Sequence, residues 1–152
     1  MRKLFFILLA LLSMQAQAQS LTKSKILKTT DLGNQKLAVN VQKQDTTFTI
    51  LFKTANRFQK QFECVLGDRD NALRLLQFLQ DLELEKGDII DLENPSGNYV
   101  KKNALGGLLV FSEGGTFSQQ LRKPHCKAFI EAIKMYCGLN QPDEDEEGDD
   151  DE

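Results

Sequence analysis

Three cysteines and a single histidine hold most of the reactive side-chain chemistry in this 152-residue chain. His125 and Cys126 are adjacent, directly after a proline that favours the first turn of a helix. There the helix dipole and the neighbouring Lys127 both favour the thiolate, which is the nucleophilic form of cysteine. Successive helical residues point about 100° apart, however, so His125 is poorly placed as the base for Cys126. A thiol-dependent or hydrolytic enzyme centred on these two residues is therefore our alternative hypothesis.

Carboxylates form two dense segments. The first, Asp81 to Glu93, contains Glu83 and Glu85, and paired carboxylates can act as acid and base in sugar hydrolysis. The chain has no tryptophan and only two tyrosines, so it lacks the aromatic side chains on which sugars usually stack. We therefore interpret this segment as a solvated helix end and loop. The second, 143–152, holds nine acids whose spacing partly matches a calcium loop but ends before the twelfth ligand position. We expect a disordered acidic tail there, no metal site and no cofactor.

The first eighteen residues have the pattern of a secretory signal peptide. A basic start precedes nine apolar residues from Leu4 to Leu12, and Ala16-Gln17-Ala18 resembles a cleavage site. The apolar run is far shorter than the roughly 20 residues that span a bilayer. We expect residues 1–18 to be removed and the mature chain to begin at Gln19. The protein is then exported, either to the periplasm or out of the cell, with no membrane span.

Export leaves two states open for the cysteines. An oxidising compartment favours one disulfide and one free thiol. Cys126 and Cys137 are eleven positions apart on one expected helix, about 16 Å, whereas a disulfide needs α-carbons within about 7 Å. Cys64, on the apolar face of an expected strand, is the candidate partner for either of them. The alternative is three buried thiols, because free cysteine packs as a small apolar side chain.

Charge is unevenly distributed. The formal net charge is −3, but the mature chain without its tail has 17 basic and 13 acidic residues. Gln19 to Phe62 carries eight basic and two acidic residues, whereas Glu63 to Glu93 carries three basic and nine acidic ones. The basic residues lack interleaved aromatic side chains for stacking on bases, and export separates the chain from nucleic acid. We expect no nucleic-acid partner.

Two-residue periodicity predicts strands at 37–41, 48–52, 58–66, 99–105, 108–111 and 116–121. The first two form a hairpin around Gln44-Asp45-Thr46, and the last two a second hairpin around Glu113-Gly114-Gly115. One amphipathic helix is expected from about Asp68 or Asp70 to Gly87.

A second amphipathic helix is expected from Pro124 to Gly138. A shift of 59 residues places Ile50-Leu51-Phe52 over Leu109-Val110-Phe111, and each block is followed by a helix. The pattern is compatible with two hairpin-helix units, although shared hairpin patterning explains the match equally well.

These elements predict an α+β domain over 19–142, with a mainly antiparallel sheet of about six or seven strands and both helices packed on one face. The opposite face would carry Thr47, Thr49, Leu51 and Lys53, an open mixed surface suited to a macromolecular partner. No catalytic or phosphate-binding motif is present in the chain. We therefore predict a non-enzymatic interaction or structural domain of the cell envelope, whose partner is an unknown protein or envelope component and whose oligomeric state is unknown.

Overall fold

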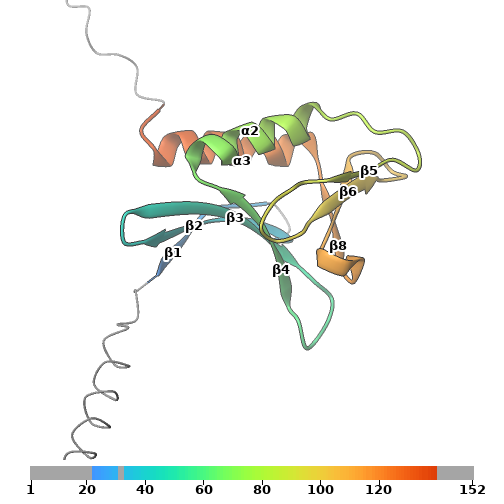
Figure 1. Ribbon diagram of the computed structural model, residues 1–152, viewed down its shortest axis with the longest axis horizontal. Helices are drawn as coiled ribbons and strands as arrows, with labels where there is room; N and C mark the ends of the chain where they lie inside the picture. The colour runs from blue at the N-terminus through green and yellow to red at the C-terminus, as the bar shows by residue number, and fades with distance from the viewer. Residues whose placement is uncertain (1–21, 31–32, 140–152) are drawn as a thin grey trace, which may run out of the picture.

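A computed structural model describes residues 22–30 and 33–139 of the chain. Its elements are β1 (Lys23–Thr29), β2 (Gln35–Gln42), β3 (Asp45–Lys53), β4 (Gln61–Gly67), α2 (Arg69–Asp81), β5 (Ile89–Asp91), β6 (Tyr99–Lys102), β7 (Leu108–Phe111), the 3-10 turn η1 (Glu113–Gly115), β8 (Ser118–Leu121) and α3 (Lys123–Tyr136). The strands form two four-stranded antiparallel sheets, sheet 1 (β1–β4) and sheet 2 (β5–β8), as Figure 1 shows. The predicted α+β class with two helices is confirmed, but the single sheet of six or seven strands is wrong.

Each sheet is a simple meander whose last strand leads into a helix. The order of four strands and one helix therefore occurs twice in the described part of the chain. The shift of 59 residues superposes β3 on β7, the third strand of each meander. At the outer edge of β4, the backbone of Val65 bonds to the side chains of Ser96 and Asn94 and not to another strand, so sheet 1 ends there.

The periodicity did not reveal β1 and β5. β1 is an edge strand with lysines at Lys23, Lys25 and Lys28, and all its residues except Leu27 are exposed. A strand with little burial has no clean alternation of apolar and polar residues to detect. β5 has only three residues, too few for a period.

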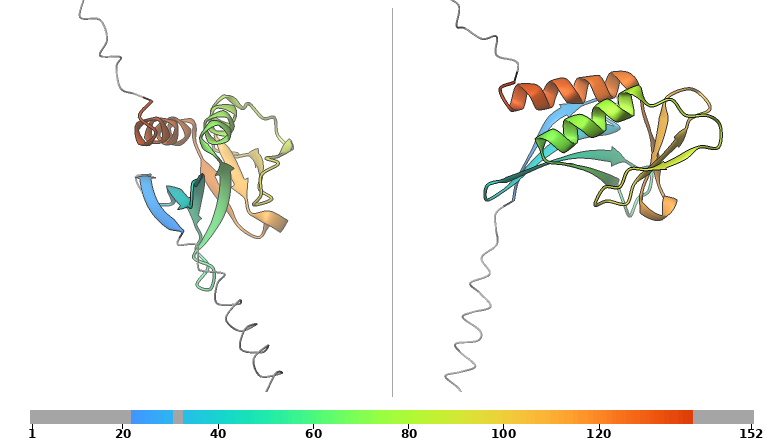
Figure 2. Two further views of the ribbon diagram at one scale, coloured as in Figure 1. Left: turned by 60° about the vertical axis from the view of Figure 1, so that its left-hand side comes forward. Right: turned by 45° about the horizontal axis from the view of Figure 1, so that its top comes forward.

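Both helices lie on the same face of sheet 1 and run side by side in opposite directions (Figures 1 and 2). α2 contacts β3, β4 and α3, and α3 also contacts β1. The helices and the two sheets share one apolar core, in which the largest fully buried side chains are Phe48, Phe52, Phe129, Leu37, Ile50, Leu76, Leu79, Leu121 and Ile133. Asp68 caps α2, because its carboxylate accepts the N–H of Asn71 at 2.9 Å.

The strand expected at 99–105 ends at Lys102, and the one expected from 116 begins at Ser118. Three other predicted boundaries are wrong for local reasons. The first hairpin turns at Lys43, whose φ is 57°, and its strands close at the pair Gln42 and Asp45, so the turn is shorter than expected. α2 ends at Asp81 and not at Gly87, because Leu82-Glu83-Leu84-Glu85 alternates and the extended chain places Leu84 in the core.

The third boundary is the start of β4, which begins at Gln61 and not at Phe58. The side chain of Asn56 accepts the N–H groups of Phe58 and Gln59, which holds this stretch as a loop. Phe58 therefore does not share the buried face of Phe62.

Candidate functional site

The face of sheet 1 opposite the two helices, which we call the open face, is the predicted partner surface (Figure 2). Side chains alternate between the faces of a sheet, so the strand register identifies its residues. Ile26, Ala38, Thr49 and Val65 form one row across the four strands. Neighbouring rows contain Ser24, Asn40, Thr47, Lys36, Leu51, Glu63, Lys53 and Gln61.

The four predicted surface residues all lie on the open face, but they differ in accessibility. Lys53 is exposed, and Thr47 and Leu51 are half-buried. Thr49 has only 2% of its surface exposed, contrary to the expectation of an open surface there. It lies on a central strand, and the amide of Asn40 contacts its hydroxyl at 3.5 Å. Contacts from longer neighbours therefore cover this short side chain.

The open face carries accessible apolar and charged side chains side by side, around a nearly buried centre at Ala38 and Thr49. Ile26 on the edge strand is 43% exposed, and Val65 on the far strand is half-buried. Lys36 on β2 and Glu63 on β4 are the exposed register partners on either side of Leu51, and exposed Lys53 follows Leu51 on the same face of β3. Non-obligate protein interfaces mix apolar and polar area in this way.

The outer edge of β4 is closed by a loop whose role the sequence analysis missed. Ser96 Oγ accepts the N–H of Val65 at 2.9 Å, and Asn94 Nδ2 donates to the carbonyl of Val65 at 3.1 Å. Asn98 Nδ2 donates to the carbonyls of Glu63 in sheet 1 and Phe111 in sheet 2, at 3.1 and 3.0 Å. The loop thus covers one edge of sheet 1 and ties the two sheets together. The Asn-Pro-Ser-Gly-Asn cluster indicated a turn here, but no sequence pattern indicates a partner so distant in the chain.

The three cysteines are free thiols. Of the two states that the sequence left open, the structure has the one without a disulfide. Burial raises the pKa of Cys64 to about 12, although a hydrogen bond from Asn94 acts in the opposite direction. Cys137, at the end of α3, is half-buried; burial raises the pKa of its thiol, Arg69 lowers it and Asp70 raises it.

Cys126 and His125 lie in the first turn of α3, as expected, but do not have the properties of a catalytic pair. Cys126 is buried in the core, and burial raises its pKa to about 12, so the thiol is protonated at neutral pH. His125 Nδ1 accepts the backbone N–H of Arg122 at 3.3 Å and thereby caps the helix. Desolvation of the thiolate outweighs the helix dipole here.

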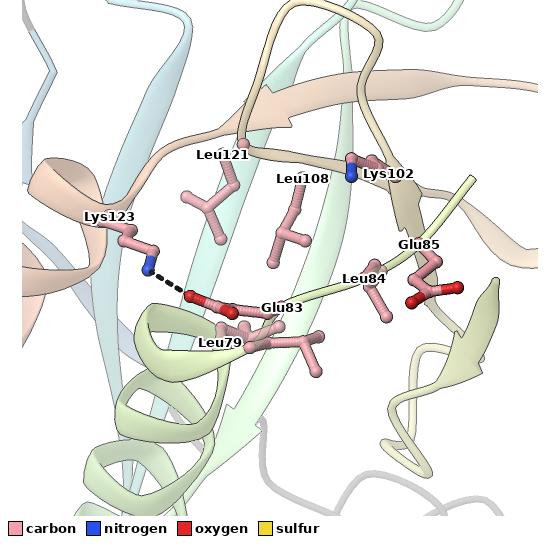
Figure 3. Close-up of a pocket in the computed structure, with 10 residues that line it drawn as sticks. Leu79, Glu83, Leu84, Glu85, Lys102, Leu108, Leu121 and Lys123 are labelled. Carbon is pink, nitrogen blue, oxygen red and sulfur yellow. Dashed lines mark ion pairs between the residues drawn. The ribbon is translucent and has the colours of Figure 1, made fainter. Parts of the chain in front are cut away.

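A cavity of about 560 Å³ opens between the end of α2 and sheet 2 (Figure 3). Four leucines form its apolar floor, namely Leu79, Leu84, Leu108 and Leu121. Glu83, Glu85, Lys102 and Lys123 line its rim, with Lys123 Nζ 4.0 Å from Glu83 Oε1. An exposed ion pair of this kind contributes at most about 1 kcal/mol. The two acids considered for hydrolysis thus lie at a rim of mixed charge, which selects neither an anion nor a cation.

Sheet 2 carries a pair of stacked rings on the face away from the core. Tyr99 on β6 and Phe111 on β7 are register partners, with ring centroids 4.8 Å apart. Lys101 Nζ lies 5.5 and 5.2 Å from the two centroids. Both rings are half-buried, so they stabilise this face and also leave an aromatic edge in contact with solvent.

Within residues 22–30 and 33–139, no group of three or more His, Cys, Asp or Glu side chains is arranged to hold a metal ion. The helices of this described part are too short or too polar to cross a bilayer. The expected signal peptide (1–18) and acidic tail (143–152) lie outside the described residues.

Comparison with protein-family models, curated proteins and solved structures found no match to this chain.

Proposed function

We propose that this protein is an exported, non-enzymatic interaction domain of the cell envelope that binds a macromolecular partner through the open face of sheet 1. The observation that carries the proposal is the one-sided packing of sheet 1. Both helices cover the same face (Figure 1), and the other face carries exposed and half-buried apolar side chains beside exposed charged ones.

The shape and chemistry of this face suit a protein surface or another extended envelope component. The face spans four strands, and Ile26, Leu51 and Val65, on β1, β3 and β4, provide apolar contact area across it. Lys36 and Lys53 supply positive charge on the same face, where exposed charges steer association more than they add affinity.

Site-specific cross-linking in the native envelope tests the proposal. A photoreactive residue at Lys36, on the open face, should give a discrete adduct whose partner can be identified by mass spectrometry. The same residue at Glu131, which is exposed on α3, is the control and should give none. Equal adducts at both positions, or none at Lys36, would contradict the assignment.

A matched pair of variants then separates a specific interface from a general effect of charge. Ile26→Glu places a carboxylate on the open face, and Met135→Glu places one on α3, where Met135 is 71% exposed. Ile26→Glu should weaken binding of the identified partner at least tenfold, because it desolvates a charge in an apolar contact. Met135→Glu should change it less than twofold. Circular dichroism of both variants checks that the fold is retained.

A further inference from the structure

The loop between β3 and β4, residues 54–60, presents an aromatic side chain to solvent at the end of a hairpin. Phe58 is 83% exposed, which is unusual for a large apolar residue on an ordered loop. The hairpin extends away from the helices, at the bottom of the view in Figure 1. The ring therefore lies at a protruding point of the molecule and not in a groove.

Hydrogen bonds within the loop hold this tip in one conformation. Thr54 donates its N–H to the carbonyl of Lys60 at 2.8 Å, and its hydroxyl donates to the carbonyl of Gln59. Asn56 Oδ1 accepts the N–H groups of Phe58 and Gln59 at 2.7 and 3.1 Å. These bonds join backbone groups to the side chains of Thr54 and Asn56 or to each other, so the loop conformation does not depend on which side chain stands at position 58.

The tip is also strongly basic. Lys53, Arg57 and Lys60 are exposed on or beside the loop, and the sequence between Asp45 and Glu63 contains no acid. The Arg57 guanidinium carbon lies 4.6 Å from the centroid of the Phe58 ring. The tip thus presents an apolar ring with one cation against it and two further lysines within five residues along the chain.

We infer that this tip docks on the surface of an anionic phospholipid bilayer, with Phe58 inserted among the lipids and Lys53, Arg57 and Lys60 against the phosphate groups. A convex tip with a single ring needs a fitted pocket to bind a protein, whereas a fluid bilayer closes around an inserted side chain. Cations at the headgroup level add attraction to an anionic surface. A single apolar group with a few basic residues gives weak, reversible attachment. This inference rests on the proposed function for the compartment. Of the tip residues, Lys53 alone also lies on the open face, whereas Arg57, Phe58 and Lys60 lie on the loop.

The absence of tryptophan from the chain allows a direct test. Phe58→Trp introduces a single fluorophore at the tip, and Leu105→Trp places the matched control at another exposed apolar position, 92% exposed on the loop between β6 and β7. Both are made in the chain that starts at Gln19, so that the apolar run from Leu4 to Leu12 cannot insert. Each variant is titrated with vesicles of phosphatidylglycerol and phosphatidylcholine in equal parts, and with phosphatidylcholine alone.

The Phe58→Trp variant should show a blue shift and quenching by brominated lipid chains with the anionic vesicles only. Raising the salt concentration from 0.1 to 0.5 M should weaken binding roughly tenfold, because the headgroup contacts are exposed to solvent. In the tryptophan-free chain, sedimentation with anionic vesicles should weaken at least tenfold for Phe58→Ala and by less than twofold for Leu105→Ala. Arg57→Gln should weaken it several-fold, and Lys86→Gln, outside the tip, should not.

Other outcomes would overturn the inference. They are equal binding to neutral vesicles, vesicle binding that Phe58→Ala leaves unchanged, or no binding at all. Loss of the envelope protein adduct in Phe58→Ala, without an effect on vesicles, would assign the tip to a protein interface. Ile26→Glu should leave vesicle binding unchanged. If vesicle binding fails while the adduct at Lys36 persists, the membrane inference falls and the proposed function stands.

Discussion

Asn98 provides the sharpest test of how the two sheets are held together. It is 2% exposed, and its Nδ2 uses both hydrogens on carbonyl oxygens of different sheets, Glu63 and Phe111. Its Oδ1 accepts from Asn94 at 2.8 Å. The substitution Asn98→Asp keeps the size of the side chain but replaces the donor with an oxygen that faces two carbonyl oxygens.

The expected cost follows from the two hydrogen bonds that the substitution removes. Both bonds are part-buried, and a carbonyl that loses its donor in such a place costs about 2 kcal/mol. We therefore expect a loss of about 4 kcal/mol in the free energy of unfolding at pH 8, a large part of the roughly 5–15 kcal/mol typical of a domain. Burial raises the pKa of a carboxyl group. The loss should shrink as the pH falls through that raised pKa, because the neutral carboxyl can donate one hydrogen bond.

Urea unfolding followed by circular dichroism measures this difference, with an unchanged m value as the check that unfolding stays two-state. Asn103→Asp is the matched control, because Asn103 Oδ1 only accepts a hydrogen bond, from the N–H of Leu105, and an aspartate can still accept it. The control should lie within about 0.5 kcal/mol of the parent. A loss below about 1 kcal/mol for Asn98→Asp at pH 8 would refute the reasoning that Asn98 joins the sheets.

Three further predictions concern the thiols, a tight turn and the start of the mature chain. Cys137 should be alkylated first in the native protein, and Cys64 and Cys126 only on unfolding. A pKa raised from 9.0 to about 12 lowers the thiolate fraction of Cys64 and Cys126 about a thousandfold. Fewer than three alkylated sites in denaturant, before reduction, would contradict the free thiols. Gly115→Ala should destabilise the protein more than Gly114→Ala, by about 1 kcal/mol or more. Both glycines have positive φ (74° and 70°), but only at Gly115 does the new methyl group meet the Tyr99 hydroxyl. Equal melting temperatures of the two variants would exclude that contact. Intact mass of the protein recovered from the envelope should correspond to a chain beginning at Gln19, and a chain beginning at the first methionine would contradict export.

Local patterns predicted the elements whose apolar residues face the core. Phe48, Ile50 and Phe52 alternate in the sequence and are fully buried on β3. Asp68 caps α2, and the helix after Pro124 closes at Gly138. Edge strand β1 was not predicted, because its side chains are mostly exposed and its sequence carries no burial signal.

The candidate site was predicted only as a face. Alternation was enough to place Thr47, Thr49, Leu51 and Lys53 on one side of β3, since that requires only the period of a strand. It could not show that Thr49 is covered while Lys53 is exposed, because coverage depends on side chains from neighbouring strands. Phe58 was placed on a strand because its spacing from Phe62 fits a two-residue period, whereas the hydrogen bonds of Asn56 make that stretch a loop.

The sequence by itself determined the α+β class, the two amphipathic helices and the buried faces of the central strands, because these depend on periodicity within a few consecutive residues. Only the tertiary structure decided that the strands divide into two sheets and that Asn98 bridges them, since its partners lie 35 and 13 positions away. The state of Cys126 was decided in the same way. Its position in the first turn of a helix favours a thiolate, but packing against the core removes water from the thiol and raises its pKa, and desolvation is a property of the folded chain alone.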